Sequence, residues 1–88
     1  MSSLIQQEML RVQRTAEKAA KADTYNIYVS TELRTSNIND TMHYVVYVGV
    51  QLPDGSHHNH KFMYQHLGET TKEFIKRIKR EIKEHFRV

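Results

Sequence analysis

Residues 42–55 read MHYVVYVGVQLPDG, and this stretch decides the fold. Every second residue from Met42 to Leu52 is apolar, which is the pattern of a β-strand with one buried face. The sequence Pro53-Asp54-Gly55 that follows is a strong turn signal, because proline fixes φ at the first corner and glycine accepts a positive φ. We therefore predict a strand over 42–52 and a type I turn with a glycine bulge, in which Leu52 pairs with Ser56.

Counting outward from this turn gives the register of the predicted hairpin. If the pairing continues without interruption, the third strand covers about residues 57–66, and Phe62 lies on the same face as Val46. The predicted pairs are Val46 with Phe62, Tyr44 with Tyr64 and Val45 with Met63.

The residues before the hairpin predict a helix, a strand and a loop. Ser3 and Gln6 form a capping box, and apolar residues at helical spacing follow it, so we expect a helix over residues 3–22. The period of the apolar residues then changes to two, which predicts a strand over residues 25–34. The polar segment 35–41 (TSNINDT) predicts a loop.

The residues after the hairpin predict a second helix. Thr70 and Glu73 form another capping box, and a helix over residues 71–87 follows. The element order is α-β-β-β-α, and the economical arrangement packs both helices on one face of a three-stranded antiparallel sheet. We therefore predict a single α+β domain over residues 1–88. The inward stripe of the second helix consists of Phe74, Ile75, Ile78, Ile82 and Phe86.

The composition is that of one small globular domain. The 88 residues are 39% apolar and 26% charged, and the formal net charge is +3. There is no cysteine, which excludes disulfides, thiol nucleophiles and cysteine-based zinc sites and fits a reducing cytosol. Residues 1–10 lack the pattern of a signal peptide, and no apolar run approaches the roughly 20 residues of a membrane span. We expect a cytoplasmic protein with no membrane partner.

A sheet that carries helices on one side leaves its other face open. If the helices cover the face of Ile27, Val29, Val46 and Phe62, the open face is unusually apolar for a solvated surface. Three interpretations remain: half-exposed strand formers, an interface with a second copy or a partner protein, or a platform on which bases of single-stranded nucleic acid stack. The residues expected on the open face are Tyr28, His43, Val45, Tyr47, Lys61, Met63 and Gln65.

The second helix, which contains KEFIKRIKREIK at 72–83, is strongly basic. Between positions 72 and 87 it carries seven basic residues and three glutamates, a net charge of +4 that exceeds the +3 of the whole chain. Its lysines recur at the spacing of one helical stripe. This stripe is either a solvated outer face or a phosphate-binding surface. The candidate phosphate contacts are Lys72, Lys76, Lys79, Arg80 and Lys83.

The α-β-β-β-α order is similar to that of the double-stranded RNA-binding domain. That family begins its last helix with a Ser-Lys-Lys-x-Ala-Lys motif. Here Thr71-Lys72-Glu73-Phe74-Ile75-Lys76 keeps the first and the last lysine, but glutamate replaces the middle lysine and isoleucine replaces the alanine. The third strand and the turn after it are also longer than in the family. The resemblance is therefore one of element order over residues 3–87, and the glutamate falls at a position that would touch phosphate.

Three histidines, His57, His58 and His60, lie together in the stretch SHHNHK. On a regular strand His58 and His60 project to the same side, as a pair of metal ligands does. Asp54 is the nearby carboxylate and there is no cysteine, so we expect no metal site. We interpret the three as solvated residues at a hairpin tip, with pH-dependent contact to a partner as the alternative.

No catalytic pattern is visible in the sequence. A glycine-rich phosphate loop, a carboxylate pair and a nucleophile motif are all missing, so we expect no enzyme activity, no cofactor and no small-molecule substrate.

The chain is therefore expected to act by binding. The first hypothesis is a nucleic-acid-binding module that neutralises phosphates with the basic helix, while the 50–60 hairpin and its histidines probe a groove or loop. The second is a protein-interaction module, either a homodimer or a small inhibitor of a host protein such as phages and mobile elements encode. Its contacts would be Tyr28, Val45, Tyr47 and Met63.

Overall fold

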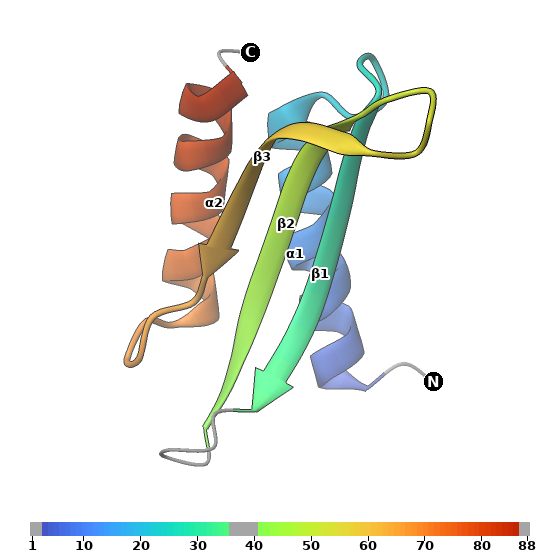
Figure 1. The fold of residues 1–88 in the computed structure, drawn as a ribbon. Coiled ribbons are helices and arrows are strands. Elements are labelled where there is room, and N and C mark those ends of the chain that lie inside the picture. Colours follow the sequence, from blue (N-terminus) through green and yellow to red (C-terminus); the bar gives the residue numbers. More distant parts are fainter. Residues whose placement is uncertain (1–2, 36–40, 87–88) are drawn as a thin grey trace.

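The computed structural model describes residues 3–35 and 41–86 (Figure 1). These residues form the predicted α-β-β-β-α order, which confirms the α+β fold class. Within this part of the chain, neither helix is long and apolar enough to cross a bilayer. The elements are α1 (Leu4–Ala20), β1 (Ile27–Thr35), β2 (Met42–Gln51), β3 (His57–Tyr64) and α2 (Thr71–Phe86).

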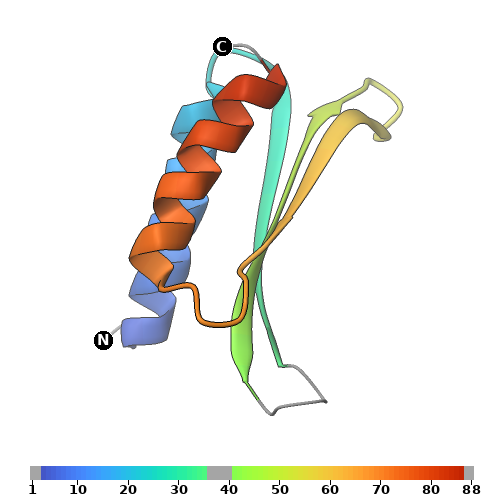
Figure 2. The ribbon, with the colours of Figure 1, turned by 90° about the vertical axis from the view of Figure 1, so that its left-hand side faces the viewer.

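The three strands form an antiparallel sheet in the order β1-β2-β3, and both helices lie on one face of it (Figure 2). This arrangement confirms the prediction that the other face of the sheet is open. The helices lie side by side and run in the same direction, so their first turns are neighbours (Figure 1). Glu8 in α1 joins them, because its Oε2 accepts hydrogen bonds of 3.3 Å from the Thr71 and Tyr44 hydroxyls. Burial, assisted by Glu8, raises the pKa of Tyr44.

Both helices begin at the predicted capping boxes. The Ser3 hydroxyl accepts from the Gln6 amide at 3.1 Å, and the Gln6 side chain accepts from the Ser3 amide at 3.0 Å. Thr70 and Glu73 make the same reciprocal pair, with both distances 3.1 Å. Each box satisfies backbone donors that the first helical turn leaves without a partner. α1 ends at Ala20, two residues before the predicted end, because Lys21 turns into the left-handed region at φ 53°.

The hydrophobic core lies between the helix layer and the sheet. α2 contributes three fully buried residues, Phe74, Ile78 and Ile82, as its apolar stripe predicts. The N-terminal half of α1 contributes fewer buried side chains to the core, and its C-terminal half packs closely through small side chains. The remaining buried members of this cluster are Val12, Ala16, Ala19, Ala20, Tyr44, Val46, Val48 and Met63.

The β2–β3 hairpin follows the predicted register only near its turn. Leu52 pairs with Ser56 as predicted, and Gln51 lies opposite His57. Between Val48 and Val50 the register then shifts by one residue, because β3 carries an extra residue in a bulge. Asn59 has a φ of 50°, a left-handed conformation that asparagine tolerates better than most residues.

The bulge reverses the faces of the remaining β3 residues, so the predicted pairs are wrong by one position. Val46 pairs with Met63 and Val45 pairs with Tyr64. Met63 is therefore 2% exposed in the core, while Phe62 is 40% exposed on the open face. The placement of Met63, Lys61 and Gln65 on the open face was wrong. Lys61 instead pairs with Glu81 of α2 at 3.5 Å, and Gln65 accepts from the Tyr44 amide at 3.0 Å.

Candidate functional site

The two flanks of α2 differ in how their charges are partnered. On the flank toward β3, Glu81 accepts from Arg77 at 3.2 Å and pairs with Lys61 at 3.5 Å. Arg77 and Glu81 are one turn apart, the spacing at which helical side chains meet. The charges on this flank are therefore largely neutralised within the chain.

Arg77 is a structural residue and is not free to bind a phosphate. Its guanidinium donates to both carboxylate oxygens of Glu69 at 2.9 Å, to Glu81 and to the carbonyl of Tyr64. Its Cζ also lies 5.2 Å from the centroid of the Phe74 ring. The hydrogen bonds from Arg77 hold the pKa of Glu69 at about 2, well below its usual range.

The other flank of α2 faces α1 and carries cations that have no carboxylate partner in the part of the chain that the structure describes. Lys79 and Lys83 line one side of an interhelical groove of about 380 Å³, and Arg11 and Lys18 of α1 line the other side. Ala19, Ile75 and Thr15 complete the lining. Within residues 3–35 and 41–86, none of these four basic groups has a carboxylate oxygen within 4.0 Å. We call these four residues the basic groove.

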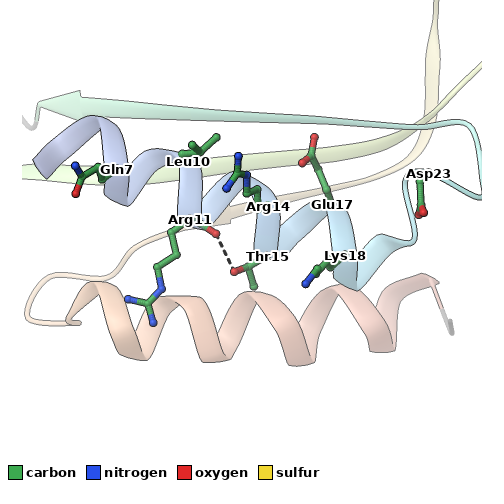
Figure 3. Close-up of a pocket in the computed structure, with 8 residues that line it drawn as sticks. All are labelled: Gln7, Leu10, Arg11, Arg14, Thr15, Glu17, Lys18 and Asp23. Carbon is green, nitrogen blue, oxygen red and sulfur yellow. Dashed lines mark hydrogen bonds between the residues drawn. The ribbon is translucent and has the colours of Figure 1, made fainter. Parts of the chain in front are cut away.

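The α1 half of the basic groove follows from how α1 is turned. Arg11 and Lys18 point toward α2, whereas Leu10 and Glu17 point toward β1 (Figure 3). The Thr15 hydroxyl donates to the Arg11 carbonyl of its own helix at 2.8 Å, so its hydrogen is used within α1. The outer surface of α1 forms a second hollow of about 630 Å³ that Arg11, Arg14 and Lys18 line with Gln7 and Asp23 (Figure 3).

Sequence reasoning missed Arg11 and Lys18. Their separation of seven residues places them on one stripe of a helix, so the sequence holds a signal that they share a face. What it does not hold is the rotation of α1 against α2, which brings this stripe beside Lys79 and Lys83.

The predicted phosphate contacts on α2 are all exposed. Lys72 and Lys76 continue the row of Lys79 and Lys83 toward the start of the helix, since the four share one helical stripe. Arg80 lies off this row, and its Nη2 is 4.0 Å from Glu81. The structure therefore brings four of the five predicted cations into one row, which remains a candidate binding surface.

The open face of the sheet carries a chain of aromatic contacts. The Tyr28 ring stacks on His57 with centroids 4.7 Å apart, and the Tyr47 ring stacks on His60 at 5.7 Å. Phe62 contacts Tyr47 edge-on at 5.9 Å, and it contacts Tyr64 at 4.9 Å. Each of the two pairs that Phe62 makes with tyrosine rings adds about 0.5–1.5 kcal/mol beyond the area it buries.

Of the residues predicted for an interface, the open face brings together Tyr28, His43, Val45 and Tyr47. Val45 is only 2% exposed although no helix covers it, because it lies at the centre of this aromatic face. Phe62 and Tyr64 take the places that Lys61 and Met63 were expected to occupy. That this surface is an interface stays a prediction.

The three hairpin histidines do not act as one group. His57 and His60 lie on the open face against Tyr47, whose hydroxyl is 3.4 Å from Nδ1 of His57. His58 pairs with Val50 and lies on the opposite face, so the expectation that His58 and His60 share a side was wrong. The Asn59 bulge between them is the reason. Among the described residues, no cluster of three or more histidines and carboxylates has the geometry to hold a metal ion.

Comparison with known proteins does not assign the chain to a family. No protein-family model, no curated protein and no solved structure matches it. The resemblance to the double-stranded RNA-binding domain stays an expectation drawn from the order of the elements.

Proposed function

We propose that the protein binds the phosphate backbone of a nucleic acid through its helix layer. The observation that carries this proposal is the basic groove, in which two helices each place two cations on one surface, with no carboxylate partner among the described residues. A structural role alone does not account for such a cluster, because like charges in proximity repel one another. A bound polyanion removes that repulsion.

The spacing of the cations suits a repeating anion. Lys79 and Lys83 are about 6 Å apart along their helix axis and Arg11 and Lys18 are about 10 Å apart, at a rise of 1.5 Å per residue. Lys72 and Lys76 lengthen the α2 row toward the start of the helix. Contacts of this kind bind the phosphate backbone and do not distinguish one base sequence from another. We favour a duplex over a single strand, because a duplex has a higher density of phosphate charge.

Paired substitutions in the groove test this proposal. Changing Lys79→Gln and Lys83→Gln together removes two charges and keeps most of each side chain. We expect the affinity for a fluorescein-labelled duplex of mixed sequence, measured by anisotropy at low salt, to fall at least about tenfold, because two phosphate contacts are lost.

The matched control keeps the charge at the same positions. The Lys79→Arg, Lys83→Arg variant should bind within about threefold of the unchanged protein. Lys61→Gln removes a cation on the β3 side of α2, outside the groove, and should also bind normally. Equal affinity of the glutamine pair and the unchanged protein contradicts the proposal.

A further inference from the structure

β1 is an edge strand whose outer side can be identified from the hydrogen bonds. The Gln51 amide donates to the Asn26 carbonyl, and β1 pairs with β2 in the register that continues from this pair. Hydrogen-bonded pairs alternate in an antiparallel ladder, so even-numbered β1 residues direct their backbone groups toward β2. The odd-numbered residues, from Ile27 to Thr35, direct theirs outward.

One half of this outer edge is already capped. The Gln13 side chain donates to the Val29 carbonyl at 2.9 Å, and its Oε1 accepts from the Thr31 hydroxyl at 2.7 Å. The Ile27 amide donates to the Tyr25 carbonyl at 2.8 Å. Beyond Val29, the backbone groups of Thr31, Leu33 and Thr35 on this edge have no partner among the described residues.

The opposite edge of the sheet is better protected. Arg77 donates to the Tyr64 carbonyl, and the His85 ring lies 3.0 Å from the Asn59 carbonyl. α2 thus occupies both ends of the β3 edge, whereas α1 occupies only the first half of the β1 edge. An unprotected edge is a template for another strand.

We propose that the protein pairs with a second copy of itself through the second half of β1, antiparallel about a two-fold axis at Leu33. A pairing centred on Thr31 is disfavoured, because that register needs the Val29 carbonyl to bond with the second copy, and Gln13 already occupies this carbonyl. A register centred on Leu33 places Glu32 of each copy opposite Arg34 of the other copy. The strand is therefore self-complementary in charge, as a two-fold interface requires.

The side chains near this edge support the same occupant. Within one chain Arg34 Nε already lies 3.0 Å from Glu32, and its Cζ lies 5.7 Å from the centroid of the Phe62 ring. In the proposed dimer, Glu32 and Arg34 each gain a neighbour of opposite charge from the second copy. On the helix side Leu10 is 47% exposed and points toward β1 (Figure 3), where the two copies would meet.

Pairing of this kind has a defined geometry. Residues directly opposite in an antiparallel pair lie on the same face, so the two-fold axis runs perpendicular to the sheet. Both helix layers then lie on one side of a continuous sheet, and both aromatic faces lie on the other. The contact is short, which predicts a dimer in the micromolar range and not an obligate one.

Charge reversal tests the proposed pairing. Sedimentation equilibrium of the full chain from about 5 μM to 1 mM should show a mass that rises from 10.4 kDa toward twice that value. Glu32→Arg and Arg34→Glu each place like charges opposite one another and should weaken association at least about tenfold. The double variant restores opposite charges and should recover association to within about threefold.

Two further variants separate the edge from general effects of charge or folding. Thr35→Pro removes an outward amide that β2 does not use, and it should weaken association while circular dichroism stays unchanged. Glu84→Arg, on α2, makes the same change of charge as Glu32→Arg makes on β1, and it should leave association unchanged. A mass of one chain at every concentration overturns the proposal, as does a double variant that is as weak as the singles.

Discussion

At the scale of single residues, Arg77 joins α2, the segment before it and the sheet through one guanidinium. It binds both oxygens of Glu69, it binds Glu81, and it covers the Tyr64 carbonyl at the sheet edge. Its side chain is 15% exposed and that of Glu69 is 13% exposed, so water screens their pairing less than it screens a surface ion pair. The sequence shows six lysines and arginines in this helix, and nothing local distinguishes Arg77 from the rest. Its role depends on Glu69, which lies eight residues earlier.

Removal of the Glu69 charge should destabilise the fold in a pH-dependent way. The pKa of Glu69 is about 2 in the folded chain and near 4.5 in the unfolded chain, so its contribution is complete above pH 4.5 and is lost as the pH falls toward 2. Glu69→Gln should lower the free energy of unfolding by about 2 kcal/mol at pH 7, because charge-assisted hydrogen bonds are lost. Urea denaturation at several pH values should show this difference shrinking below pH 4.5. A difference that is constant from pH 7 to pH 2 contradicts the account.

At the scale of elements, the bulge at Asn59 decides which side chains of β3 enter the core. The turn, the strands and both capping boxes could be predicted, because each depends on residues close in sequence. The bulge could not, since no glycine or proline marks it and the alternation of β3 reads equally well in either register. Because of this shift of one residue, Met63 lies in the core in place of the predicted Phe62. It also moved Lys61 from the open face to the ion pair with Glu81.

Substitution of Asn59 tests whether its left-handed backbone is needed. Glycine adopts a φ of 50° without steric cost, so Asn59→Gly should be as stable as the unchanged protein or slightly more stable. Asn59→Val should cost about 1–2 kcal/mol, because a β-branched side chain disfavours this conformation. Thermal unfolding followed by circular dichroism should place the valine variant roughly 5–10 °C below the glycine variant. Equal melting temperatures contradict the assigned bulge.

At the scale of the whole molecule, the two layers present different chemistry. The helix layer carries the basic groove, and the sheet carries an aromatic face with rings half exposed, such as Tyr64 at 49%. The lysine row of α2 could be predicted because it lies on one element. The contribution of Arg11 and Lys18 could not, because it depends on how two helices far apart in sequence pack together. Charge that is distributed over two elements in this way is assembled only by the tertiary fold.

The salt dependence of nucleic-acid binding tests the central claim most directly. The slope of log Kobs against log salt concentration, measured by anisotropy with a short duplex, reports the phosphates that the protein neutralises. Four contacts from the basic groove predict a slope of about −3.6, and the Lys79→Gln, Lys83→Gln variant should reduce its magnitude by about 1.8. A slope near zero, or the same slope in the unchanged protein and the glutamine variant, contradicts the claim that this groove binds a phosphate backbone.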